Sequence, residues 1–317
     1  MGQFSTKHPR IRRRGSDLPS SAERSLHTLS SKGSLDRGKH GLRALCVPNP
    51  FAAHDKRKKS TSSEQIGYLL PVNIHERERL NKQHVFMRAA LGAHHFAPVS
   101  QPKKVLDVGT GTAIWIKDMA ELWPSSRFYA IDTTHPDRQD VKFKFAFADL
   151  FDGLPYSDRT FEYVHQRFMF SAIPVHKWPS VLAELHRVTR PGGYLEVVDT
   201  SMRLSPAGPI TSQLFAFMNN MLTANGIGMA LAGDQLGGWL REAGFEPEER
   251  RIASVPIGEW GGEPGSMCFY SWCLLIRSLK DKLLSSNTLR SWDFELLMTE
   301  WQSEIEEMRT SCEILYL

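Results

Sequence analysis

The sequence predicts an α/β fold in which helices alternate with the strands of a mainly parallel sheet. From residue 66 onward, apolar runs of strand length alternate with stretches of helical period, the pattern of βα units. A glycine-rich turn, VLDVGTGTAIW, follows the first of these runs, and an acidic residue lies at or just after the end of each of the first three. In parallel sheets such turns and acids lie at the carboxyl edge, where ligands bind.

Each predicted element follows from the period of its apolar residues and from the glycine or proline that ends it. In chain order they are a helix over Ile74–Leu91, a strand over Lys104–Val108, a helix over Ala113–Leu122, strands over Arg127–Ile131, Lys142–Ala146 and Phe161–His165, a helix over Trp178–Val188, a strand over Tyr194–Val198, helices over Ser212–Asn225 and Asp234–Ala243, and a sixth strand near Glu246–Ser254.

The turn after the first strand has the composition of a nucleotide-binding loop. Gly109 and Gly111 supply the tight turn and the close backbone approach that a ligand needs, and Ala113 is the small residue where the helix packs on the strand. A dinucleotide pattern, GxGxxG, requires its third glycine at position 114, which is Ile114. This spacing disfavours a bound pyrophosphate.

The acidic residues indicate the charge of the ligand. Asp107 in the first strand would repel a phosphate and attract an ammonium group. Asp132, which ends the second strand, can accept both hydroxyls of a ribose. Asp149 follows the third strand and can accept from an exocyclic amine, with Leu150 offering apolar surface to a purine. Together these three positions predict a site for a cationic nucleoside.

These motifs, with the block FEYVHQRFMFSAIPVHKWPSVLAELHRVTRPGGYLEVVD, resemble the class I S-adenosylmethionine-dependent methyltransferases. GYLLP, ERERLNKQH, VHQR, RVTRPGGYLE and GEWGGEPG are similar to the fungal LaeA/UMTA-like branch, which contains enzymes of secondary metabolism and regulators associated with velvet proteins. The resemblance covers about residues 66 to 317. It implies a Rossmann-like, mostly parallel seven-stranded sheet of order 3-2-1-4-5-7-6, with the last strand within Ser311–Leu317, and S-adenosylmethionine as cofactor.

The resemblance also assigns roles to residues. The predicted cofactor-binding residues are Asp107, Gly109, Thr110 and Gly111 for the methionine moiety, Asp132 and Thr133 for the ribose, Asp149 and Leu150 for the adenine, and His165 beside them. The predicted acceptor pocket consists of Arg167, Phe168, Phe170 and Trp260, with the WGG segment as a mobile lid. His165 is either a base that assists proton removal or a residue that only shapes the pocket. No metal site is expected.

Residues 1–65 are predicted to be a disordered basic tail, since residues 1–60 hold 14 Lys/Arg against 4 Asp/Glu. Arg12-Arg13-Arg14 and Lys56–Lys59 match nuclear-import clusters, and the opening residues match a weak N-myristoylation pattern at Gly2. No secretory signal or transmembrane run is seen, which favours a cytoplasmic or nuclear protein. The chain stops within the seventh expected strand, so a shortened gene model is an open alternative.

Three functions compete. The first is a methyltransferase acting on an O or N atom of a small molecule, a fungal secondary metabolite. The second is a LaeA-like regulator of secondary metabolism and development that acts in the nucleus through a velvet-type protein partner, favoured by the basic tail and by the acidic face expected on a helix over Ser291–Met308. The third, a nicotinamide-dependent dehydrogenase, is disfavoured by the glycine spacing. No specific nucleic-acid binding is expected.

Overall fold

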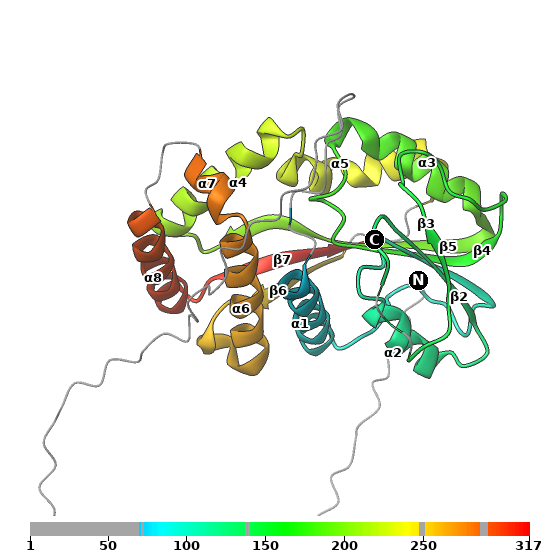
Figure 1. Ribbon diagram of the computed structural model, residues 1–317, viewed down its shortest axis with the longest axis horizontal. Helices are drawn as coiled ribbons and strands as arrows, with labels where there is room; N and C mark the ends of the chain where they lie inside the picture. The colour runs from blue at the N-terminus through cyan, green and yellow to red at the C-terminus, as the bar shows by residue number, and fades with distance from the viewer. Residues whose placement is uncertain (1–69, 71–72, 137, 139, 247–250, 286–290) are drawn as a thin grey trace, which may run out of the picture. The chain divides into compact units, whose positions relative to one another are not determined.

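A seven-stranded sheet forms the centre of the computed structural model, which describes residues 70, 73–136, 138, 140–246, 251–285 and 291–317 (Figure 1). The strand order is β3-β2-β1-β4-β5-β7-β6, and β7 runs antiparallel to both of its neighbours. The order expected from the resemblance is therefore confirmed. The strands are β1 (Lys104–Val108), β2 (Arg127–Asp132), β3 (Lys144–Phe147), β4 (Phe161–Arg167), β5 (Thr189–Ser205), β6 (Arg251–Pro256) and β7 (Ser311–Tyr316).

Helices cover both faces of this sheet. Figure 1 shows α1, α2 and α6 on one face and α3, α4 and α5 on the other. The helices are α1 (Ile74–Leu91), α2 (Ile114–Leu122), α3 (Trp178–Val188), α4 (Pro209–Ala224), α5 (Met229–Glu242), α6 (Gly262–Ser278), α7 (Lys280–Ser285) and α8 (Ser291–Met308). Two short 3₁₀ turns, Val175–Lys177 and Glu259–Gly261, precede α3 and α6. Among the described residues, none of these helices combines the length and apolarity needed to span a bilayer.

The periodicity of α3 explains how a helix is held on the sheet. Its apolar residues recur at helical spacing, and Trp178, Val181, Leu182, Leu185 and Val188 are all buried. They pack against apolar side chains of β1, β4 and β5 in one continuous core. Burying each such side chain contributes about 1.5–3 kcal/mol, so this face holds α3 on the sheet.

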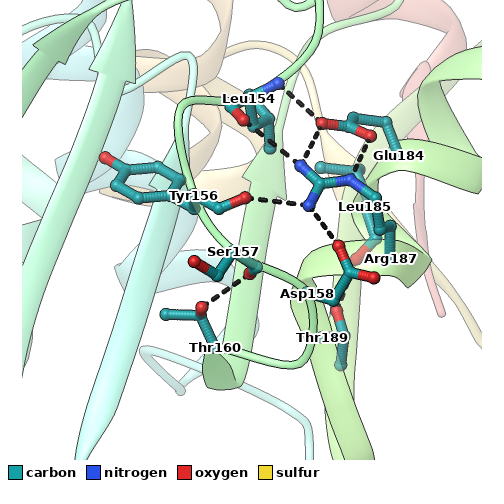
Figure 2. A network of polar contacts seen from close by, with 9 residues as sticks. All are labelled: Leu154, Tyr156, Ser157, Asp158, Thr160, Glu184, Leu185, Arg187 and Thr189. Atoms are coloured by element: carbon teal, nitrogen blue, oxygen red, sulfur yellow. Dashed lines mark hydrogen bonds and ion pairs between the residues drawn. The ribbon is translucent and has the colours of Figure 1, made fainter.

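The connection from β3 to β4 contains no helix, and a network of ion pairs and hydrogen bonds holds this segment against α3 (Figure 2). Arg187 of α3 forms a two-point contact with Glu184, with 2.8 Å from Nε to Oε2 and 2.6 Å from Nη2 to Oε1. The same guanidinium donates to the carbonyl of Tyr156 at 2.8 Å and to Asp158 at 2.6 Å. Glu184 accepts the backbone N–H of Leu154 at 2.6 Å. These contacts fix the segment that returns from the ligand edge to the start of β4.

The structure lengthens three predicted strands and leaves some predictions outside its description. β2 extends by one residue to Asp132, and β5 begins at Thr189 instead of Tyr194. β5 continues from Val198 to Ser205 because its later residues pair with β7, a partner that sequence periodicity does not reveal. β4 extends to Arg167. The predicted tail over residues 1–65, with Gly2 and both basic clusters, lies outside the described residues, as do residues 247–250 of the predicted sixth strand.

Candidate cofactor and acceptor site

A cavity of about 270 Å³ lies at the carboxyl ends of β1, β2 and β4, with residues of α1 lining it as well. Every site residue predicted from the sequence lines this cavity except Trp260. The residues concerned are Asp107, Gly109, Thr110, Gly111, Asp132, Thr133, Asp149, Leu150, His165, Arg167, Phe168 and Phe170. A larger cavity of about 710 Å³ lies at the opposite, amino edge of the sheet, lined by Gly192, Gly193 and Leu317 among others.

The glycine turn has the backbone that its sequence predicts, with one difference. Gly109 and Gly111 have φ angles of 65° and 55°, which favour glycine. A β carbon at Gly109 would collide with the sulfur of Met169, so that position has no room for a side chain. Ala113 also has a positive φ, 55°, and is fully buried. An alanine at this position therefore carries a conformational strain of about 1–2 kcal/mol that a glycine would not.

Asp107 is held by two side chains of the site. Its Oδ1 lies 2.8 Å from Nδ1 of His165, and its Oδ2 accepts from the Thr110 hydroxyl at 2.6 Å. The pair forms because Asp107 and His165 lie directly opposite each other on β1 and β4. Trp115 of α2 stacks on the imidazole with ring centroids 3.7 Å apart. His165 is only 2% exposed, so its contacts are those of a firmly held wall residue.

Asp132 connects the second strand to the glycine turn. Its Oδ2 accepts the N–H of Gly111 at 2.8 Å, and its Oδ1 accepts the N–H of Thr134 at 2.9 Å. Burial raises the pKa of this carboxyl, and the backbone donors, Gly111 first, oppose that rise. Asp149 is the more exposed acid, and its Oδ1 accepts the N–H of Phe151 at 2.9 Å in a local turn. Each oxygen has a second lone pair, so both carboxylates keep acceptor capacity toward a ligand.

Sequence reasoning missed a chain of polar contacts that joins β4, α1 and α2. Arg167 donates from Nη2 to Nδ1 of His84 at 3.0 Å, and Nε2 of His84 lies 2.9 Å from Oδ2 of Asp118. Arg88 also donates to Asp118. Burial, followed by the charge of Arg167, lowers the pKa of His84 to about 4. Arg167 was predicted to line the acceptor pocket and His84 belongs to the ERERLNKQH motif, but the contacts that join them to Asp118 connect three elements, so no local signal in the sequence could have revealed these contacts.

The segment after β4 forms the apolar wall of the cavity. Phe168, Met169 and Phe170 line it, and Phe168 has a φ of 54°. The backbone of Phe170 donates to Asp199 of β5 at 3.0 Å, and Asp199 is 5% exposed. Burial raises the pKa of Asp199 to about 7. Asp199 was also missed, because sequence analysis ended the fifth strand one residue before it.

Trp260 is placed elsewhere, and the prediction that it lines the acceptor pocket is corrected. The WGG segment is a 3₁₀ turn that leads directly into α6, and no free lid is formed by its glycines. The indole of Trp260 donates to the carbonyl of Ile257 at 2.9 Å, and its backbone N–H donates to Glu306 of α8 at 3.0 Å. Glu304 accepts two N–H groups at the start of α4. The acidic face of α8 thus binds other segments of this chain in part.

Comparison with known proteins agrees with this geometry. Methyltransferase pytC of Aspergillus terreus is 27% identical over 211 residues, 62% of this chain and 63% of that protein. The chain thus spans somewhat less than two thirds of the length of pytC. The N-methyltransferase sirN of Leptosphaeria maculans is 25% identical over 76% of this chain and 90% of that protein, and gliN of Aspergillus fumigatus is 25% identical over 76% and 91%. Residues 75–250 match the methyltransferase domain family, and the chain belongs to that family.

Proposed function

We propose that this protein transfers a methyl group from S-adenosylmethionine to an O or N atom of a small molecule of the fungal secondary-metabolite type. The observation that carries the proposal is the single cavity that joins the glycine turn and Asp132 to the apolar wall of Phe168 and Phe170. S-adenosylmethionine is the cofactor of class I methyltransferases, the fold type that the strand order identifies. The relatives named N-methyltransferases support an N atom as one acceptor.

The residues present fit this cofactor. The backbone at Gly109 and Gly111 can approach a ligand closely, and Asp132 can accept the two hydroxyls of a ribose through its remaining lone pairs. Leu150 supplies apolar surface beside Asp149 for a base. The cavity is slightly smaller than most ligand pockets, about 300–1,000 Å³. The flexible side chain of Met169, which packs over Gly109, accounts for part of the filled space.

The cofactor, when bound, supplies a methyl group that is already activated by the sulfonium charge. The protein then has to align the acceptor and exclude water, and a dedicated base is optional. His165 is engaged with Asp107 through Nδ1 and covered by Trp115 on one ring face. These contacts favour a role in shaping the pocket over a role as base.

Membership of the LaeA/UMTA-like branch is likewise a proposal, which rests on the motifs GYLLP, VHQR and GEWGGEPG. A regulatory role through a velvet-type partner would draw on the basic segment over residues 1–60. Deleting that segment tests this role. Loss of a cellular phenotype with intact methyl transfer in vitro would favour the regulator, and loss of neither would favour the metabolite enzyme.

Isothermal titration with S-adenosylhomocysteine and, separately, with NADH tests the proposed cofactor. We expect micromolar affinity for S-adenosylhomocysteine and no heat signal with NADH, because the turn lacks the glycine spacing of a dinucleotide site. The opposite pattern would overturn the proposal.

A further inference from the structure

Arg167 is the last residue of β4 and one of the residues that line the site cavity. Its Nη2 donates to Nδ1 of His84 at 3.0 Å, and no other hydrogen bond or ion pair of Arg167 occurs within the described part of the chain. A guanidinium carries five N–H donors and no acceptor. Most of the donors of this partly buried cation are therefore still available.

The one partner of Arg167 does not neutralise its charge. Because an arginine can only donate, Nδ1 of His84 must be the acceptor, and Nε2 of His84 then carries the proton directed at Asp118. Burial and the neighbouring Arg167 lower the pKa of His84 to about 4, so the imidazole is neutral at pH 7. Burial also lowers the pKa of Arg167 itself, while nearby carboxylates oppose that change. The contact with His84 fixes the direction of the guanidinium and leaves its charge unpaired.

The nearby carboxylates, Asp107, Glu196 and Asp118, act against the burial that lowers the pKa of Arg167, but within the described residues none of them forms an ion pair with it. Both oxygens of Asp107 are bound, by His165 and by Thr110. Glu196 accepts two backbone N–H groups with Oε2, and its buried Oε1 has no hydrogen-bond partner among the residues that the structure describes. Glu196 and Arg167 both line a separate cavity of about 20 Å³, which is the size of one water molecule. Such a water would use one donor of Arg167, which lines the main cavity as well, and would leave further donors for a ligand.

We propose that Arg167 is the carboxylate-binding residue of this site. A planar guanidinium matches a carboxylate at two points, and a bound carboxylate would supply the direct ion-pair partner that this partly buried cation lacks among the described residues. The carboxylate belongs either to the amino-acid end of the cofactor or to the acceptor molecule. The inference rests on the proposed function, since both sources presuppose a methyl transfer site. His84 and Asp118 act as positioning residues for Arg167.

The test is a thermodynamic cycle measured by isothermal titration, in which a change of the protein is combined with a change of the ligand. Coupling means that the effect of removing the carboxylate from the ligand depends on the residue at position 167. The affinities of S-adenosylhomocysteine and of its decarboxylated analogue are measured for the wild type, Arg167→Gln and Arg167→Lys. If the cofactor supplies the carboxylate, the analogue binds the wild type about 10- to 100-fold more weakly, and Arg167→Gln removes most of that difference. Arg167→Lys keeps the charge without the planar fork and retains an intermediate difference. Arg190→Gln, at an exposed ion pair with Glu162, is the matched control and should behave as the wild type.

A second titration distinguishes the two sources of the carboxylate. Benzoate is titrated into each variant saturated with S-adenosylhomocysteine. Arg167 binds the carboxylate of the acceptor if benzoate binding is lost in Arg167→Gln but kept in Arg190→Gln, and if the first cycle shows no coupling. Absence of coupling in both titrations overturns the proposal. If Arg167→Gln does not fold, a partial loss in Arg167→Lys gives the same assignment, and wild-type behaviour of Arg167→Lys overturns the proposal. A wild type that does not bind S-adenosylhomocysteine at all contradicts the proposed function itself, and so the two failures are distinguishable.

Discussion

Lowering the pH should weaken the fold through His84, which connects α1 to the site. The pKa of this imidazole falls from 6.5 to about 4 on folding, mainly because of burial. A lowered folded-state pKa means that the unfolded chain binds the proton more tightly. The stability due to neutral His84 is thus present above pH 6.5 and is lost as the pH falls toward 4. Between pH 7.5 and 5 this linkage amounts to about 2 kcal/mol of unfolding free energy.

The matched variant is His84→Gln, whose amide can accept from Arg167 and donate to Asp118 but cannot titrate in this range. Urea unfolding of both proteins is followed by circular dichroism at several pH values from 7.5 to 5. The other titrating groups are the same in both proteins, so their effects cancel in the difference. The unfolding free energy of the wild type should therefore fall by about 2 kcal/mol relative to that of His84→Gln between pH 7.5 and 5. A difference that does not change with pH would refute the assignment of a buried, neutral His84 as the acceptor for Arg167.

Three further outcomes are expected. Asp132→Ala should weaken S-adenosylhomocysteine binding on the order of ten- to a hundredfold in a titration, and unchanged affinity would place the ribose elsewhere. Arg187→Gln should lower the unfolding free energy by about 1–2 kcal/mol, since it removes the ion pairs of Arg187 with Glu184 and Asp158 that Figure 2 shows. The control variant Arg190→Gln should change it by less than about 0.5 kcal/mol. The pKa of Asp199 is raised to about 7, which favours the protonated form in the folded state. The stabilisation of the fold by this protonated carboxyl is therefore fully present below pH 3.8 and is lost as the pH rises through 7. Asp199→Asn should remove that pH dependence from unfolding curves, and a wild-type-like dependence would contradict the burial argument.

Much of the ligand edge could be predicted because it follows from local sequence. Gly109, Asp132 and Asp149 could be identified as site residues from local sequence alone. Each lies in a glycine turn or at or just after the end of an apolar run of strand length. Parallel strands bring their carboxyl ends to one edge, so these side chains line one cavity in the structure.

The parts of the site that could not be predicted depend on the pairing register of the strands and on contacts between elements that are distant in the sequence. Asp107 meets His165 because β1 and β4 pair in one particular register, which no spacing in the sequence reveals. The chain from Arg167 through His84 to Asp118 spans three elements. Trp260 was misplaced because a tryptophan before two glycines is typical of a loop, whereas contacts with Ile257 and α8 hold it in a 3₁₀ turn.

The most direct test of the central claim is a crystal structure with S-adenosylhomocysteine. We predict electron density across the carboxyl ends of β1 and β2, with the ribose hydroxyls on Asp132 and the base beside Leu150. Density in the cavity of about 710 Å³ at the amino edge of the sheet, or a ribose that does not contact Asp132, would contradict the account.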